Sequence, residues 1–197
     1  MKYIKKYFCF IIMNRYYIFI ITLLMLGIPV FSCPGEAGED TLKHHLSRMG
    51  ILELSSTTDA PDFTLMDIHN RKISLSELRG KIVLLHIWAT WCKPCMEEMP
   101  SIQKLYEKFK DNDFAVLAVS IDREGIGAVK PYVDKYGLTF PILLSGSGKI
   151  SKSYWTWGIP ACYLIDKKGK IIGRALGQRN WAGDDAARLI EELSGKK

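Results

Sequence analysis

Two long apolar runs, at residues 81–88 and 114–121, dominate the hydrophobic pattern of the chain. Runs of this kind, with little polar alternation, are typical of strands that are buried on both faces of a sheet. Between them, residues 95–110 carry apolar side chains at helical spacing, which predicts a helix with one buried face and a kink at Pro100. Strand, helix and strand in this order predict a parallel βαβ unit.

The segments on either side of this unit also have regular patterns. Two short stretches around residues 67–71 predict a β-hairpin, and a capped single turn follows at 76–80. The later elements that we expect are a helix over 124–136, a strand over 138–144, a short helix over 150–155, paired strands over 161–165 and 170–175, and a helix over 184–193. Together these elements predict an α/β fold with a central mixed β-sheet flanked by helices.

The first 33 residues differ in composition from the rest of the chain. Basic side chains lead into an apolar stretch over 16–31, which has the length of a signal-peptide core and is short for a membrane span. The stretch ends at Cys33 in a way that resembles a bacterial lipoprotein signal, where a cysteine is lipidated, although Phe31 stands where a smaller residue is usual. A simple cleaved signal and a retained membrane anchor are the alternatives, and Met13 is a second plausible start. All three versions place the domain outside the cytoplasm, in the periplasm or cell envelope.

Residues 34–58 are interpreted as a linker between the leader and the domain. This segment is polar and contains glycine at first, and it includes a helical pattern over 41–49 and a short strand predicted over 51–54. From Ala60 the alternation becomes regular. We therefore expect a leader over 1–33, a linker over 34–58 and one domain over 59–197.

The net charge of +6 belongs mostly to the leader, which holds four basic residues and no acidic ones. Without the leader, 23 basic residues stand against 21 acidic ones, which gives +2. This balance lacks the excess of basic residues that is typical of a nucleic-acid-binding domain. The five cysteines are too few for a scaffold held together by disulfides. Their number fits a domain with one functional pair of cysteines.

Cys92 and Cys95 form a Cys-x-x-Cys motif where the strand over 81–88 passes into the following helix, and such a motif indicates redox chemistry. A helix N-terminus offers unpaired N–H groups and the positive end of a dipole, and both favour the reactive thiolate of Cys92. Lys93 adds a positive charge, unless its side chain is simply solvated. A structural disulfide or half of a metal site is the alternative, but zinc usually takes four ligands and no histidine follows His86.

Three short sequences resemble those of the thioredoxin superfamily. They are Trp-Ala-Thr-Trp-Cys-Lys-Pro-Cys at 88–95, Gly-Ile-Pro at 158–160 and Tyr-Leu-Ile-Asp at 163–166. The front hairpin, the segment around 122–144 and the Glu-Met-Pro sequence that follows the cysteines resemble the exported TlpA/ResA branch of that superfamily. The resemblance covers about residues 59–193. It implies a thioredoxin-like fold with an N-terminal β-hairpin and a central αβ insertion.

The resemblance also implies roles for individual residues. Cys92 would be the exposed nucleophile, Cys95 the resolving cysteine, and the two would form the redox-active disulfide. The Ile159–Pro160 peptide would be cis and would lie beside the pair, and Glu98 would take part in proton handling. The residues that we expect around the substrate groove are Trp91, Lys93, Pro94 and Ile159.

His86 departs from the family pattern, which usually has Asp or Asn at this position. It lies two residues before Trp88 and therefore on the same face of the strand. Two roles remain open for it, a buried base beneath Cys95 or a hydrogen-bonded core histidine. For Glu98 the alternative to proton handling is an exposed acid that stabilises the helix dipole. Cys162, in a predicted central strand, is interpreted as a small buried hydrophobe.

Taken together, the motifs predict an extracytoplasmic thiol–disulfide oxidoreductase of reducing type. The resemblance implies that it acts on disulfide-containing exported proteins, apocytochrome c among them, and that a membrane thiol transporter supplies its electrons. We expect no cofactor, no metal and no nucleic-acid partner, and membrane attachment through the leader. Two alternatives share the fold. A peroxiredoxin-like peroxidase would need a different spacing between Thr90 and Cys92, and a copper chaperone would need a histidine downstream of the pair.

Overall fold

The computed structural model describes residues 36–146, 150, 153–154 and 158–195 of the chain. The leader with Cys33 and Met13, and most of the short helix expected over 150–155, lie outside these residues. Residues 38–197 form one compact unit. No helix in the described part of the chain has the length and apolar character that a membrane crossing requires.

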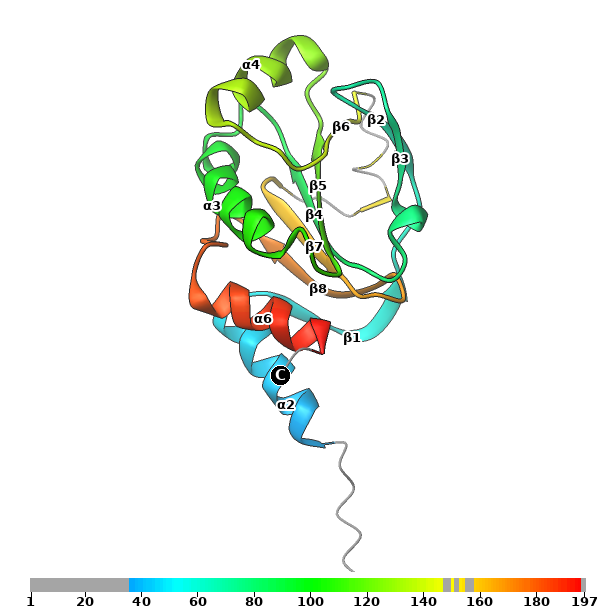
Figure 1. Cartoon of the computed structure of the whole chain (residues 1–197), viewed down its shortest axis with the longest axis vertical. Coiled ribbons are helices and arrows are strands. Elements are labelled where there is room, and N and C mark those ends of the chain that lie inside the picture. The colour runs from blue at the N-terminus through cyan, green and yellow to red at the C-terminus, as the bar shows by residue number, and fades with distance from the viewer. Residues whose placement is uncertain (1–35, 147–149, 151–152, 155–157, 196–197) are drawn as a thin grey trace, which may run out of the picture. The chain divides into compact units, whose positions relative to one another are not determined.

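Eight strands form one sheet in the order β1-β8-β7-β4-β5-β6-β2-β3 (Figure 1). Strands β4, β5 and β6 run parallel, and every other neighbouring pair is antiparallel, so the sheet is mixed as predicted. The strands are β1 (Leu52–Asp59), β2 (Thr64–Asp67), β3 (Lys72–Ser74), β4 (Ile82–Trp88), β5 (Phe114–Ser120), β6 (Ile142–Leu144), β7 (Ala161–Ile165) and β8 (Lys170–Leu176).

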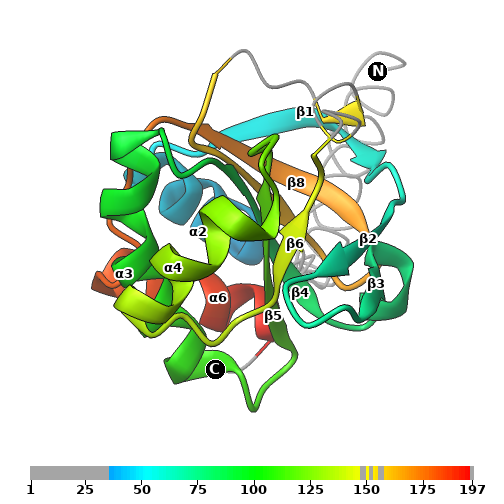
Figure 2. The same cartoon turned by 90° about the horizontal axis from the view of Figure 1, so that it is seen from above.

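The described helices gather on one side of the sheet (Figure 2). They are α2 (Glu36–Arg48), α3 (Lys93–Phe109), α4 (Ile126–Tyr136) and α6 (Asp184–Ser194). Each contributes apolar side chains to a single core cluster, for example Leu46, Met99, Val129 and Leu189. A second cluster on the opposite face is covered by the β2–β3 hairpin, the short helix η1 (Leu75–Leu78) and the side chains of Ile150 and Tyr154.

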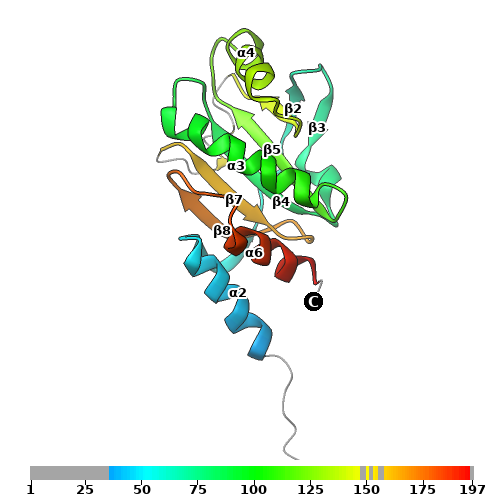
Figure 3. The ribbon, with the colours of Figure 1, turned by 60° about the vertical axis from the view of Figure 1, so that its left-hand side comes forward.

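The central βαβ unit forms as the hydrophobic pattern predicts. Strands β4 and β5 pair in parallel along their whole length, and α3, which connects them, lies across the sheet (Figure 3). Pro100 lies inside α3, where it has no N–H to give to the carbonyl of Met96. The hydroxyl of Tyr132 in α4 donates to that carbonyl instead, at 2.7 Å. The proline therefore leaves an acceptor that ties α4 to α3.

Within the segment over 34–58, which we expected to be a linker, α2 ends at Arg48 and β1 begins at Leu52, so the helical pattern over 41–49 and the short strand over 51–54 are confirmed. After α2 the chain turns at Gly50, whose φ of 60° suits glycine, and β1 then pairs with β8. The guanidinium of Arg179 holds this turn by donating to the carbonyls of Met49 and Gly50. The sequence indicated only the start of this strand, over 51–54, because residues 55–59 are polar.

Candidate active site

The disulfide between Cys92 and Cys95 lies at the start of α3. Its S–S distance is 2.03 Å and its Cα atoms are 5.2 Å apart. Cys92 is the N-cap of the helix, and its sulfur accepts the backbone N–H of Cys95 at 3.3 Å. When the bond is reduced, this N–H and the helix dipole favour a thiolate on Cys92. The expected helix start is confirmed and refined, since α3 begins at Lys93.

The two sulfur-bearing residues differ in accessibility. Cys92 retains 6% exposure and Cys95 has none. Cys92 is therefore the more accessible of the pair, but it is far less exposed than the resemblance implies. The reason is its N-cap position, where it packs into the core cluster while the neighbouring Trp91 is 66% exposed.

A buried carboxylate fixes the turn that leads into the pair. Asp122, just after β5, accepts hydrogen bonds from the backbone N–H and the hydroxyl of Thr90. It also accepts one from the hydroxyl of Ser120. The parallel pairing of β4 and β5 brings these segments to the same edge of the sheet. The loop before Cys92 is thus held by groups about thirty residues away in sequence.

The Ile159–Pro160 peptide is cis, as the resemblance implies. The next residue, Ala161, pairs with Ile87 near the end of β4. Pro160 therefore lies at the edge of the sheet from which β4 leads to Cys92. The carbonyl of Pro160 accepts the N–H of Gly177, which anchors this loop to the end of β8.

Glu98 is almost completely buried on α3, one helical turn beyond Cys95. Its Oε1 accepts a hydrogen bond from the indole N–H of Trp181, and its Oε2 has no hydrogen-bond partner. Burial raises the pKa of this carboxyl to about 7 despite the hydrogen bonds that oppose the shift. Glu98 is therefore not an exposed first-turn acid, and it can hold or release a proton near neutral pH.

His86 and Cys162 are direct partners across strands β4 and β7. The Nδ1 atom of His86 lies 3.1 Å from the sulfur of Cys162 and 4.0 Å from Oε2 of Glu98. Burial lowers the pKa of His86 to about 3, so the ring is neutral at physiological pH. Of the two roles left open by the sequence, this environment supports the hydrogen-bonded core histidine over the base.

The comparisons with known proteins agree with this geometry. The model of the AhpC/TSA family matches residues 57–174, which is more than half of the chain. The chain belongs to the AhpC/TSA family. Within it, the chain is 36% identical over 166 residues to the thiol-disulfide oxidoreductase ResA of Bacillus cereus, a match that covers 84% of this chain and 90% of that protein.

Solved structures of similar proteins support the same assignment. The thioredoxin domain of a thiol-disulfide oxidoreductase from Bacteroides vulgatus is 29% identical, with a TM-score of 0.63, and the match covers 72% of this chain and 99% of that one. StoA from Bacillus subtilis is 27% identical, with a TM-score of 0.57, and the match covers 68% and 96%. This AhpC/TSA family member therefore has a thioredoxin-like fold and is a thiol–disulfide oxidoreductase of the ResA and StoA type.

The four residues expected around the substrate groove differ in exposure. Trp91, Lys93 and Pro94 are exposed beside the disulfide, and Ile159 is half-buried. The ammonium of Lys93 lies 3.8 Å from the carboxylate of Glu97. Because both groups are solvated and opposite in charge, the effect of Lys93 on the thiolate of Cys92 is weaker than its position in the motif indicates.

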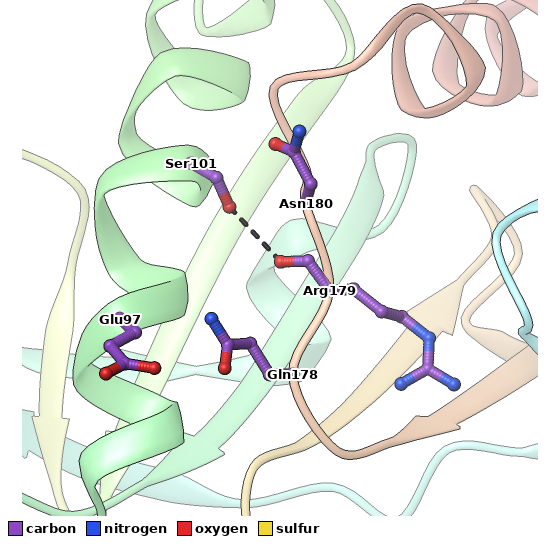
Figure 4. A pocket seen from close by; sticks show the side chains of 5 residues that line it. All are labelled: Glu97, Ser101, Gln178, Arg179 and Asn180. Atoms are coloured by element: carbon purple, nitrogen blue, oxygen red, sulfur yellow. Dashed lines mark hydrogen bonds between the residues drawn. The ribbon is translucent and has the colours of Figure 1, made fainter.

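A polar pocket of about 410 Å³ lies between α3 and the segment over 178–180 (Figure 4). Glu97 and Ser101 line it from the helix, and the hydroxyl of Ser101 donates to the carbonyl of Arg179 across it. None of the four groove residues predicted from the sequence lines this pocket. It adjoins the segment that carries Trp181 rather than the face of the disulfide.

Sequence reasoning missed three residues of this family member's site: Asp122, Cys162 and Trp181. Each acts through a contact that joins distant parts of the chain, and no spacing in the sequence reports such contacts. Of the three, only Cys162 could have been found from the sequence. If the strand after Pro160 pairs with the strand before the cysteines, Cys162 comes to lie opposite His86.

Proposed function

We propose that this oxidoreductase works outside the cytoplasm, where it reduces disulfide bonds of other exported proteins. The Cys92 thiolate attacks a substrate disulfide, forms a mixed disulfide and expels one substrate thiolate. Cys95 then attacks the sulfur of Cys92, which releases the second substrate thiol and closes the Cys92–Cys95 disulfide. Two electrons pass from the pair to the substrate in each cycle, so an external thiol donor has to reduce the pair again.

The unequal burial of the two sulfurs is the observation that carries this proposal. Cys92 is the only residue of the pair with any exposed surface, and it caps the helix. Cys95, fully buried, cannot meet a protein substrate directly but lies in position to attack Cys92. The order of attack and release follows from this difference.

The surroundings of Cys95 support the reducing direction. Cys95 and Glu98 are three residues apart on α3, and both face the core. Residues at this spacing are neighbours on a helix surface, so an ionised Glu98 disfavours a thiolate on Cys95. At Cys95 this repulsion opposes the stabilisation of the reduced form that makes the strong oxidants of this class.

The leader supports the location and the attachment. A basic and apolar leader that ends at Cys33 fits export followed by lipidation, which would tether the domain to the outer face of a membrane. A membrane thiol–electron donor is the matching electron source for a tethered reductase. Disulfide-containing proteins in the same compartment, including apocytochrome c before haem attachment, are the substrates of this proposal. The exchange itself requires neither a cofactor nor a metal.

The two alternatives on the same fold receive less support from the geometry. The hydroxyl of Thr90 donates to Asp122, so it is engaged away from the chemistry that a peroxidatic cysteine would need. The sulfur of Cys92 has Cys95 as its partner, which suits thiol–disulfide exchange. A copper chaperone would need a histidine downstream of the pair, and the sequence has none.

Trapping in cells tests the proposal. The full-length Cys95→Ser variant is expected to accumulate mixed disulfides with exported proteins, because Cys92 can attack but nothing displaces the substrate. Non-reducing gels followed by mass spectrometry would identify the trapped proteins and the mature N-terminus.

The double variant Cys92→Ser, Cys95→Ser is the matched control and should trap nothing. Adducts with cytoplasmic proteins alone would refute the extracytoplasmic role, and an unmodified Cys33 in the mature protein would refute lipidation.

A further inference from the structure

Three buried side chains from three different elements meet in the core. His86 comes from β4, Cys162 from β7 and Glu98 from α3. All three are nearly or completely inaccessible, and one nitrogen, sulfur or oxygen atom of each lies within 4.8 Å of the others. In the catalytic cycle that we propose, we expect Glu98 to exchange a proton with Cys95, and this leaves His86 and Cys162 without a role.

The protonation states of this trio are set by burial. His86 is neutral and so carries one ring N–H, because burial lowers its pKa to about 3. Burial also raises the pKa of Cys162 well above its ordinary value, so the residue stays a thiol with one S–H. Glu98 is the only member of the three that changes charge near neutral pH. The trio therefore contains two weak hydrogen-bond donors and one carboxyl that can accept hydrogen bonds.

The contacts give these donors a direction. The sulfur of Cys162 lies 3.9 Å from Oε1 of Glu98, within reach of an S–H hydrogen bond. The same sulfur lies 3.1 Å from Nδ1 of His86. The other ring nitrogen, Nε2, is buried without a partner. Because orphaned N–H groups are rarer in folded proteins than orphaned acceptors, the ring proton belongs on Nδ1, where the sulfur accepts it.

We propose that Cys162 is a positioning residue for Glu98, because its thiol accepts a hydrogen bond from His86 and donates one to the carboxylate, which stabilises the ionised form. The chain runs from Nδ1–H of His86 through the thiol to Oε1 of Glu98, where the indole of Trp181 donates as well. The inference rests on the proposed role of Glu98 in proton exchange. The hydrogen-bond chain itself exists in the oxidised protein without substrate.

The other groups that face Glu98 are few. The loop after β8 contributes the Trp181 indole and the positive charge of Arg179. That guanidinium is already bonded to four backbone carbonyls, those of Met49, Gly50, Leu176 and Gly177. In the oxidised protein Cys92 and Cys95 do not titrate. The charge of Glu98 can therefore be followed there without interference from the catalytic thiols.

A metal ion bound by the trio is the competing interpretation, and the contacts favour it less. A metal-bound imidazole usually donates its second N–H to a neighbouring group, whereas Nε2 of His86 has no partner. Oε1 of Glu98 is engaged by Trp181. The trio also offers only three ligands, all nearly or completely buried in the core.

The test is an NMR titration of the Glu98 carboxyl in the oxidised protein. Cys162→Val and Cys162→Ala remove the donor, and we expect each to raise the midpoint by about half a pH unit, which corresponds to about 0.7 kcal/mol and is the size of a weak hydrogen bond. Cys162→Ser keeps a donor and strengthens it, so its midpoint should lie at or below that of the wild type. Equal upward shifts in the serine and valine variants would reduce Cys162 to a packing residue and overturn the proposal.

Two measurements on the wild-type chain keep the proposal testable if the variants fold poorly. Nitrogen-15 shifts should show the His86 proton on Nδ1, and a proton on Nε2 would overturn the chain, because Nδ1 would then compete for the thiol proton. Titration of the oxidised protein with Zn²⁺ alone should give no stoichiometric binding. One bound equivalent that Cys162→Ser abolishes would replace the positioning role by a metal site. Neither result depends on reductase activity, so failure here is distinct from failure of the proposed function.

Discussion

Replacing Cys92 by serine is expected to reduce disulfide-reductase activity to the uncatalysed background, whereas replacing Cys95 by serine should leave the first step intact. The reason is the position of the two sulfurs, since Cys92 caps α3 with some exposure and Cys95 is fully buried. A hydroxyl at position 92 is no substitute for a thiolate, because only the thiolate is the nucleophile in this exchange. Reduction of insulin by dithiothreitol measures the loss.

The two variants should fail in different ways. With a small aromatic disulfide as substrate, Cys95→Ser should release one equivalent of aromatic thiol in a single burst and then stop as a stable mixed disulfide. Cys92→Ser should give no burst. Intact mass would show the adduct on the first variant alone. A burst from Cys92→Ser, or an adduct on Cys95 there, would mean that the buried sulfur can meet substrates and that the order of attack is reversed.

Replacing Glu98 by glutamine is expected to stabilise the folded protein at alkaline pH and, at the same time, to lower its rate of disulfide reduction. The pKa of Glu98 is raised from 4.5 to about 7 in the folded state. Between these two values the folded protein keeps a proton that the unfolded chain has lost, so stability falls as the pH rises towards 7. Above pH 7 the folded state bears the full cost of a buried charge, about 3 kcal/mol.

Glutamine imitates the neutral carboxyl and escapes this cost. In urea unfolding of the oxidised protein, Glu98→Gln should match the wild type near pH 4.5 and exceed its stability by up to about 3 kcal/mol at pH 8.5. The depressed pKa of His86 makes both proteins less stable as the pH falls below 6.5, and this contribution cancels in the difference. Glu97→Gln is the matched control, because Glu97 is the exposed neighbour and should show no such pH dependence.

The same variant should lose activity because the proton that Cys95 exchanges has no partner. General acid–base catalysis contributes on the order of 100-fold or more, and we expect a loss of this size in the rate of disulfide reduction near neutral pH. A variant that gains stability and loses activity marks a residue kept for function. If Glu98→Gln were as active as the wild type across the pH range, Glu98 would have no part in proton exchange.

Local pattern was sufficient for most of the fold. The apolar runs of β4 and β5 are typical of buried strands, and the spacing of apolar residues in α3 is typical of a helix with one buried face. Their positions therefore followed from the sequence. The helix α2 and the edge strand β1 were predicted only in part, over 41–49 and 51–54, because their burial depends on β8 and the core cluster rather than on their own pattern.

The candidate site divides in the same way. Cys92 and Cys95 have a motif, and Pro160 and Glu98 were found through the family resemblance. Trp181 is 83 residues from Glu98, and Cys162 is 76 residues from His86. Contacts of this range are created by sheet order and loop packing, which a single sequence does not specify. The buried surroundings of Glu98, and hence its raised pKa, became visible only with the structure.

A brief pulse of iodoacetamide on the reduced wild-type protein tests the central claim most directly, because it asks which sulfur is presented for attack. Peptide mapping by mass spectrometry reports each cysteine separately. The arrangement at the start of α3 predicts that Cys92 is alkylated first, while Cys95 and Cys162 are spared. Alkylation of Cys95 before Cys92, or of both at equal rates, would contradict it.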